Sequence, residues 1–267
     1  MGLKEAGGVP GLGAGESGAR TAGSFLRSEY EDGRRQWAAR RRRAVFLSAL
    51  WWAPAAVAFG LLAGVGTHFA LFGVLVTVLA LAAVMDVAFQ RPESLDRIKA
   101  RAAAESSTAR TLEMLKVRGG GHTINDRYFG ATADPFEVEH LVVTPRGVFL
   151  VDSKEWRGFD VRLLGTELYV NHVHQGAALK EMVAHAQTLG EALTVCAAAD
   201  EEVGVVTVSC VLAVHADGLT GTPRVMGGAI VVRPEQLLAV LRSPDLRWSA
   251  RATRHVADAA ESLLRPR

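Results

Sequence analysis

The pattern of hydrophobic positions divides the chain into an apolar segment near its N-terminus and a longer segment in which apolar and polar residues alternate. Two nearly continuous apolar runs cover residues 44–66 and 67–89. Asp86, in the second run, is the only charged residue in either of them. Each run is long enough to cross the hydrocarbon core of a membrane as a helix, which takes about 20 apolar residues. We therefore predict two transmembrane helices over residues 44–89. A long buried hairpin in a soluble protein is the alternative.

Basic residues flank this hairpin on both sides. The run RRQWAARRRR at 34–43 precedes it, and Arg91, Arg97, Lys99 and Arg101 follow it. By the positive-inside rule, both flanks lie in the cytoplasm. We expect a multi-pass protein of the cell membrane, in contact with the lipid bilayer and with both termini cytoplasmic. The arginine run is interpreted as a topology signal that contacts anionic lipid, with nucleic-acid binding as the alternative.

The rest of the chain is predicted to have three further parts. Residues 1–43 are read as a flexible basic tail, residues 90–102 as a juxtamembrane connector, and residues 103–267 as the soluble domain. The tail carries nine Lys and Arg against five Asp and Glu, so it alone accounts for the positive net charge of +2. The soluble domain therefore shows no obvious basic face. Its two cysteines are too few for a disulfide framework or a zinc site.

Within the soluble domain, the period of the apolar positions changes repeatedly between that of a helix and that of a strand. The order is helix, three strands, helix, strand, which is typical of an α/β sandwich with a mixed sheet. Two further helices are expected near the C-terminus. The predicted helices are 101–117, 176–199, 234–243 and 249–264, and the predicted strands are 122–129, 136–144, 147–154 and 203–214, with a small hairpin over 159–170.

The sequence Thr-Pro-Arg-Gly at 144–147 predicts a tight turn between two of these strands. A two-residue loop would place Glu139 opposite Asp152. A type I turn with a glycine bulge would place His140 opposite Asp152 instead. The sequence leaves both registers open.

This hairpin gathers the charged residues Glu137, Glu139, Asp152 and Lys154. Asp152 and Lys154 are two positions apart on a strand, so they share one face. Paired carboxylates repel each other unless a cation lies between them, and carboxylate oxygens are suitable ligands for Mg²⁺. Lys154 would then hold a phosphate or a water. The alternative is a solvated, salt-bridged face with no function in chemistry.

The segment 137–158 resembles the core of the NERD (nuclease-related domain) family. That family shows an acidic residue followed by His, an apolar strand, Pro-x-Gly, and then acidic-x-Lys-x-Trp-x-Gly. A helix carrying Ala104-Glu105 resembles the family's Gly-Glu helix, and Asn125-Asp126-Arg127 resembles its first strand. The matching residues in the core are Glu139-His140, Pro145-Arg146-Gly147 and Asp152-Ser153-Lys154-Glu155-Trp156-Arg157-Gly158.

The resemblance implies a restriction-endonuclease-like fold of the PD-(D/E)xK superfamily, with the order α-β-β-β-α-β. It implies Glu139 and Asp152 as ligands of Mg²⁺ or Mn²⁺, Lys154 as the residue that positions or activates water, and Glu105 as an auxiliary acid. The implied reaction is hydrolysis of phosphodiester bonds in DNA or RNA. Two departures, Glu139 in place of the usual Asp and Ala104 in place of Gly, keep an alternative open. This alternative is a catalytically inactive module that binds nucleic acid or a protein partner at the membrane.

Overall fold

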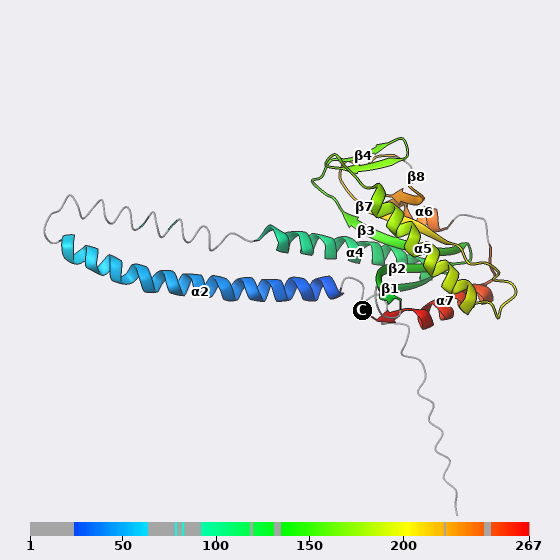
Figure 1. The fold of residues 1–267 in the computed structure, drawn as a ribbon, viewed down its shortest axis with the longest axis horizontal. Coiled ribbons are helices and arrows are strands. Elements are labelled where there is room, and N and C mark those ends of the chain that lie inside the picture. The colour runs from blue at the N-terminus through cyan, green and yellow to red at the C-terminus, as the bar shows by residue number, and fades with distance from the viewer. Residues whose placement is uncertain are drawn as a thin grey trace, which may run out of the picture. The chain divides into compact units, whose positions relative to one another are not determined.

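The structure is a computed structural model that divides into two compact units (Figure 1). The first spans residues 26–99, and the second joins the residues before Leu26 to residues 100–267. The structure describes residues 24–63, 78, 82, 92–117, 120–130, 135–221, 223–242 and 247–266, with the backbone alone for 24, 48–63 and 117.

The first unit contains nearly all of helix α2, which runs from Ser24 to Ala63. The tail that we predicted to be flexible up to residue 43 is thus helical from Ser24 onward. Arg35 approaches Glu31 at 3.9 Å and Asp32 at 3.8 Å, one turn away on the same helix. Such pairs stabilise a helix only slightly, by about 0.2–0.5 kcal/mol each.

The predicted transmembrane hairpin falls largely on residues that the structure does not describe. Residues 64–77, 79–81 and 83–91, which include the expected turn and most of the second span, lie outside the described part. Among the described residues, no helix combines the length and the apolar character that a membrane span needs. The hairpin therefore stays a prediction.

The second unit begins within helix α4 (Glu93–Val117), which continues into it from the first. The other elements follow in an order that confirms the predicted succession of helix, three strands, helix and strand. They are β1 (His122–Phe129), β2 (Phe136–Thr144), β3 (Gly147–Glu155), β4 (Val161–Leu164), β5 (Glu167–Val170), β6 (Val173–His174), α5 (Gly176–Cys196), β7 (Val208–His215), β8 (Arg224–Met226), β9 (Ala229–Val232), η1 (Pro234–Gln236), α6 (Leu237–Leu241), α7 (Ala250–Leu263) and β10 (Arg265–Pro266).

Seven strands form one mixed sheet in the order β10-β1-β2-β3-β7-β9-β8. Strands β3 and β7 are parallel, as are β7 and β9, and the other neighbours are antiparallel. A separate small sheet is formed by β4, β5 and β6, which follow β3 and precede α5 in the sequence. The predicted mixed α/β fold is therefore confirmed.

Helices cover both faces of the large sheet. On one face, Leu150 of β3 belongs to a buried core with residues of α5 and α7, such as Leu189 and Val256. On the other face, Val151 belongs to a core with Leu112 of α4 and Leu237 of α6. Because side chains alternate along a strand, consecutive residues of β3 serve opposite layers. Asp152 and Lys154 consequently point to the face that α5 covers.

Several boundaries differ from the prediction. Helix α4 begins at Glu93, so the predicted connector 90–102 is mostly helix. Strand β7 begins at Val208 rather than at 203, and α5 ends at Cys196 rather than at 199. Strands β6, β8, β9 and β10 are too short for a periodic signal to reveal them.

Candidate nuclease site

The turn between β2 and β3 settles the register of the hairpin. Thr144 pairs with Gly147 and His140 pairs with Val151, as a two-residue loop requires. The first of the two predicted registers is confirmed, and the glycine bulge is wrong. Gly147 has a φ of 149°, in the region that favours glycine.

The regular pairing of β2 with β3 ends at His140, and the next residue of β2 is Glu139. Here a side-chain oxygen replaces the backbone carbonyl as hydrogen-bond acceptor. The Ser153 amide donates a 2.8 Å hydrogen bond to Oε2 of Glu139. The bond satisfies a buried amide that has no partner across the hairpin. It also fixes one oxygen of the Glu139 carboxyl group.

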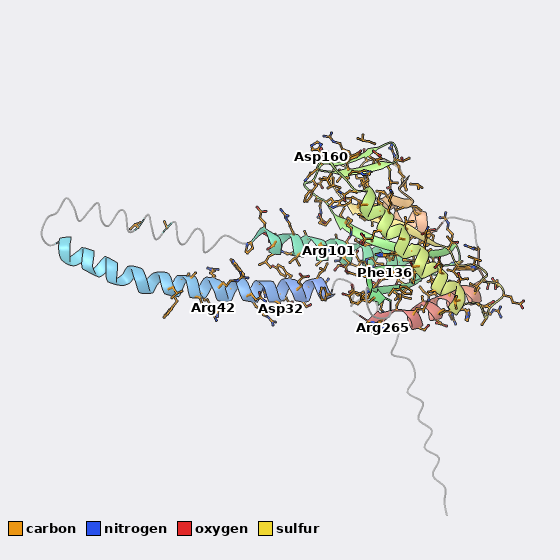
Figure 2. The ribbon with its side chains drawn as sticks, viewed as in Figure 1. Asp32, Arg42, Arg101, Phe136, Asp160 and Arg265 are labelled. Carbon is orange, nitrogen blue, oxygen red and sulfur yellow. The ribbon has the colours of Figure 1, made fainter. Side chains whose placement is uncertain are left out.

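A cleft of about 230 Å³ lies at this end of the hairpin. Its walls come from α4, from β2 and β3, and from the first turns of α5. Arg101, labelled in Figure 2, contributes to this lining from α4. The lining residues are Arg101, Glu137, Glu139, Leu150, Val151, Asp152, Lys154, Ala178, Glu181, Met182 and His185.

Three of the four predicted site residues therefore meet in this cleft: Glu139, Asp152 and Lys154. The fourth, Glu105, is buried on α4, with 1% of its surface exposed, and is not part of the cleft wall. Its charge still acts on Glu139, because it contributes to raising the pKa of that carboxyl group. The catalytic roles of all four residues stay a prediction.

The two carboxyl groups of the cleft strongly influence each other. Burial raises the pKa of Glu139 well above its usual value, and repulsion from Asp152 raises it further. Oδ1 of Asp152 is buried and receives no hydrogen bond within the described part of the chain. A proton or a cation between the two carboxyl groups would reduce their repulsion and give Oδ1 of Asp152 a partner.

Each carboxylate is also paired with one basic side chain. Nζ of Lys154 lies 2.6 Å from Oδ2 of Asp152, and a guanidinium nitrogen of Arg101 lies 3.2 Å from Oε1 of Glu139. Burial alone would lower the pKa of Lys154, but attraction to Asp152 and Glu139 raises it. Lys154 is therefore a cation, suited to holding a phosphate or orienting a water rather than to accepting a proton.

A layer of buried and half-buried polar groups supports the site from the other side of the sheet. Nδ1 of His140 lies 2.8 Å from Oδ1 of Asn125, and Thr108 of α4 lies 3.0 Å from Nε2 of His215. Burial lowers the pKa of His140 to about 4, so this ring is neutral near pH 7. The contact with Asn125 gives His140 a structural role in this layer.

The carboxylate oxygens of the cleft fit a divalent cation that takes only some of its ligands from the protein. Among the described residues, no three His, Cys, Asp or Glu side chains are grouped as metal ligands. Mg²⁺, however, is commonly held by one or two carboxylates together with waters and substrate phosphate. Glu139 and Asp152 supply such a pair, and the buried Oδ1 of Asp152 lacks a donor. These two residues would hold the ion.

Sequence reasoning missed three charged or polar residues of the cleft, namely Arg101, Glu181 and His185. Arg101 was assigned to a connector, although it stands four positions before Glu105, one helical turn away. Glu181 and His185 have the same spacing on α5, which would have placed them on one face. The ring of His185 stacks on Phe136 of β2, with the centroids 4.0 Å apart and the rings nearly parallel.

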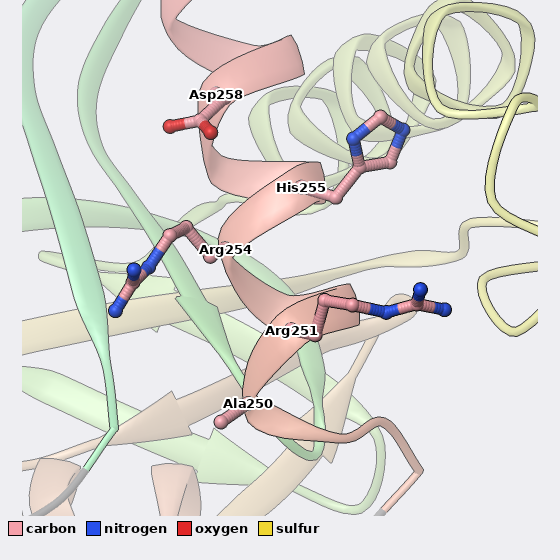
Figure 3. Close-up of a pocket in the computed structure, with 5 residues that line it drawn as sticks. All are labelled: Ala250, Arg251, Arg254, His255 and Asp258. Atoms are coloured by element: carbon pink, nitrogen blue, oxygen red, sulfur yellow. The ribbon is translucent and has the colours of Figure 1, made fainter.

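A second hollow, of about 470 Å³, is larger but chemically less organised. Its lining residues are Ala250, Arg251, Arg254, His255 and Asp258, all from α7. Figure 3 shows Arg254 and Asp258 on one side of the helix and Arg251 and His255 on the other. Because these side chains diverge, the cleft between β2, β3 and α5 is the better candidate.

The fold and the cleft can now be set beside known proteins. A helix, three antiparallel strands, a helix and a parallel strand form a mixed α/β fold that carries two carboxylates and a lysine at the open end of the central hairpin. Residues 100–215 match the family model of the nuclease-related domain, NERD. This range of the chain is therefore similar to the nuclease-related domain. Neither the curated proteins nor the solved structures include a match to this chain.

Proposed function

We propose that the chain is a metal-dependent nuclease that hydrolyses phosphodiester bonds of DNA or RNA. The observation that carries this proposal is the convergence of Glu139, Asp152 and Lys154 in one open cleft, where Oδ1 of Asp152 lacks a hydrogen-bond donor. The match of residues 100–215 to the nuclease-related domain supports it.

Each residue has a distinct role in this proposal. Glu139 and Asp152 would hold Mg²⁺ or Mn²⁺, an ion that activates water and stabilises negative charge on the phosphate. Lys154, a cation beside Asp152, would bind a non-bridging phosphate oxygen and orient the attacking water. The Ser153 amide fixes the Glu139 carboxyl group, and the buried Glu105 adds negative charge behind it.

The test is cleavage by the full-length chain, purified in detergent because residues 44–89 are so apolar. Labelled single-stranded and double-stranded DNA and RNA are incubated with Mg²⁺ or Mn²⁺, and the products are resolved by size. Cleavage that EDTA abolishes and that Lys154→Ala removes would support the proposal. Equal cleavage by the wild type and by Lys154→Ala would point to a contaminant and reject it.

The alternative is a module that binds without cleaving. The ion pair between Arg101 and Glu139 favours it, because this contact already neutralises one of the two carboxylates. Binding of nucleic acid weakens steeply as salt concentration rises. Salt-sensitive binding of DNA or RNA without any cleavage would therefore favour the inactive module, and salt-insensitive capture of a protein partner would favour an interaction scaffold.

We further propose that residues 44–89 anchor the domain at the cytoplasmic face of the cell membrane. This proposal is supported by the two apolar runs and by the arginines on both flanks. It predicts that the chain stays with membranes after alkaline carbonate extraction. It also predicts that a protease added to the cytoplasmic side removes residues 103–267, whereas release by carbonate would contradict the anchor.

A further inference from the structure

Arg101 occupies an unusual position among the carboxylates of the cleft. Its guanidinium group lies 3.2 Å from Oε1 of Glu139 and also interacts electrostatically with Glu137 and Asp152. The side chain of Arg101 is 46% exposed, whereas that of Glu139 is 7% exposed. A partly exposed cation thus covers the outer oxygen of a buried acid.

This contact conflicts with the role of Glu139 as a metal ligand. Oε2 of Glu139 already accepts the hydrogen bond from Ser153, so Oε1 is the oxygen that faces the cleft. The guanidinium and a divalent cation would compete for this oxygen, because two positive charges at one carboxylate oxygen repel each other. Bound metal therefore requires that Arg101 move away.

Arg101 can move at little cost and remain useful. A partly exposed ion pair contributes about 1 kcal/mol or less, and the long side chain stays within the cleft when its head swings outward. There it would join Lys154, the other cation of the cleft. A guanidinium fork matches the geometry of phosphate oxygens and forms two parallel hydrogen bonds with them.

We propose that Arg101 exchanges partners in the working cycle. It neutralises Glu139 while no divalent cation is bound, and it binds a phosphate group of the nucleic acid once the cation has taken Glu139. This inference rests on the proposed nuclease function and gives it a second phosphate-binding residue beside Lys154. As a result, bound metal raises the affinity for the phosphate of the substrate, and bound phosphate raises the affinity for the metal.

The first experiment measures Mn²⁺ binding to the full-length chain in detergent by isothermal titration calorimetry. Arg101→Gln frees Oε1 of Glu139, so Mn²⁺ should bind about 3- to 10-fold more tightly than in the wild type. The control is Arg110→Gln, which removes the same charge from an exposed position on the same helix. It should change the affinity by less than about 2-fold, because a distant exposed charge is screened.

The second experiment measures binding of thymidine 3′,5′-bisphosphate at saturating Mn²⁺, with the same three proteins. Arg101→Gln should bind this probe about 10-fold more weakly, because a charged hydrogen-bonding partner of phosphate is lost. Arg110→Gln should again resemble the wild type. Opposite changes in metal and probe affinity are the signature of an exchange of partners.

The outcomes separate this inference from the nuclease proposal. Equal Mn²⁺ and probe affinities in the wild type and Arg101→Gln would overturn the exchange and leave the nuclease proposal intact. Tighter Mn²⁺ binding with unchanged probe affinity would overturn the phosphate-binding role of Arg101. Failure of the wild type to bind Mn²⁺ would overturn both the exchange and the metal site.

Discussion

The two ends of the β2–β3 hairpin are built in opposite ways. At the turn, every strand position from His140 to Thr144 is paired across the hairpin with a partner from Gly147 to Val151. At the open end the pairing stops, and the carboxyl group of Glu139 binds the amide of Ser153 instead. The turn end is held by backbone bonds and apolar packing. The open end is held by side chains whose charges are then available for chemistry.

This comparison predicts that substitutions at the open end change activity and that those at the turn end change stability. The largest expected effect is that of Asp152→Asn, which keeps the shape of the side chain but removes its charge. We expect cleavage to fall about 1,000-fold, because a metal ligand and the partner of Lys154 are both altered. The assay is the initial rate of cleavage of a labelled oligonucleotide.

The matched control is Asp160→Asn. Asp160 pairs with Arg162 at 2.6 Å outside the cleft, beside β4. Its substitution should change the rate by less than about 2-fold. Similar losses for Asp152→Asn and Asp160→Asn would contradict a specific role of the cleft.

The next effect concerns the packed part of the hairpin. Leu141 is fully buried between the sheet and its helices, so Leu141→Ala should lower the free energy of unfolding by about 3–4 kcal/mol. Chemical denaturation followed by circular dichroism measures this change. Val225→Ala, at a side chain that is 64% exposed, should cost less than about 0.5 kcal/mol. A loss at Leu141 no larger than at Val225 would refute the packing argument.

Acid should weaken the polar layer behind the hairpin. Burial lowers the pKa of His140 to about 4, whereas the unfolded chain has the ordinary value of 6.5. Between these values the unfolded chain binds a proton that the folded chain excludes, so stability is lost as the pH falls. We expect a loss of about 2–3 kcal/mol from pH 6.5 to pH 4.

The measurement is the free energy of unfolding at several pH values for the wild type, His140→Gln and His172→Gln. His140→Gln should lack this part of the pH dependence. His172 lies on an exposed turn, and its substitution should preserve the pH dependence. An unchanged pH dependence in His140→Gln would show that another group causes it.

The smallest predicted effect lies at the turn end. The backbone amides of Arg247 and Trp248 donate to the carbonyl oxygen of Pro145, and α7 begins directly afterwards. Oγ of Ser249 caps that helix by accepting a 3.2 Å hydrogen bond from the amide of Ala252. Ser249→Ala should cost about 1 kcal/mol in thermal unfolding experiments and leave cleavage unchanged. Lost cleavage at full stability would mean that the two ends are coupled.

Local signals explain which parts of the fold could be predicted. The alternation of apolar residues and the Pro-Arg-Gly turn define β2 and β3 within the sequence itself, and these two strands carry Glu139, Asp152 and Lys154. Strand β9 has only four residues, and its place in the sheet comes from parallel pairing with β7, in which Cys210 pairs with Ala229. No local pattern could reveal such a strand.

The part of the site on α4 was harder to predict for a different reason. Charged residues dominate the start of this helix, so its first turns resemble a solvated connector, and Arg101 was not recognised as a partner of Glu139. The contact joins residues 38 positions apart. The choice between the two registers likewise needed the pairing of whole strands.

The edges of the large sheet have a consequence for solubility. Its outermost strands are β10, with two residues, and β8, with three. Because a long, flat edge invites pairing with another chain, short edge strands protect against aggregation. Pro266 in β10 adds to this protection, since proline has no amide hydrogen to offer an incoming strand. Many copies crowded together on one surface would therefore tend to remain separate.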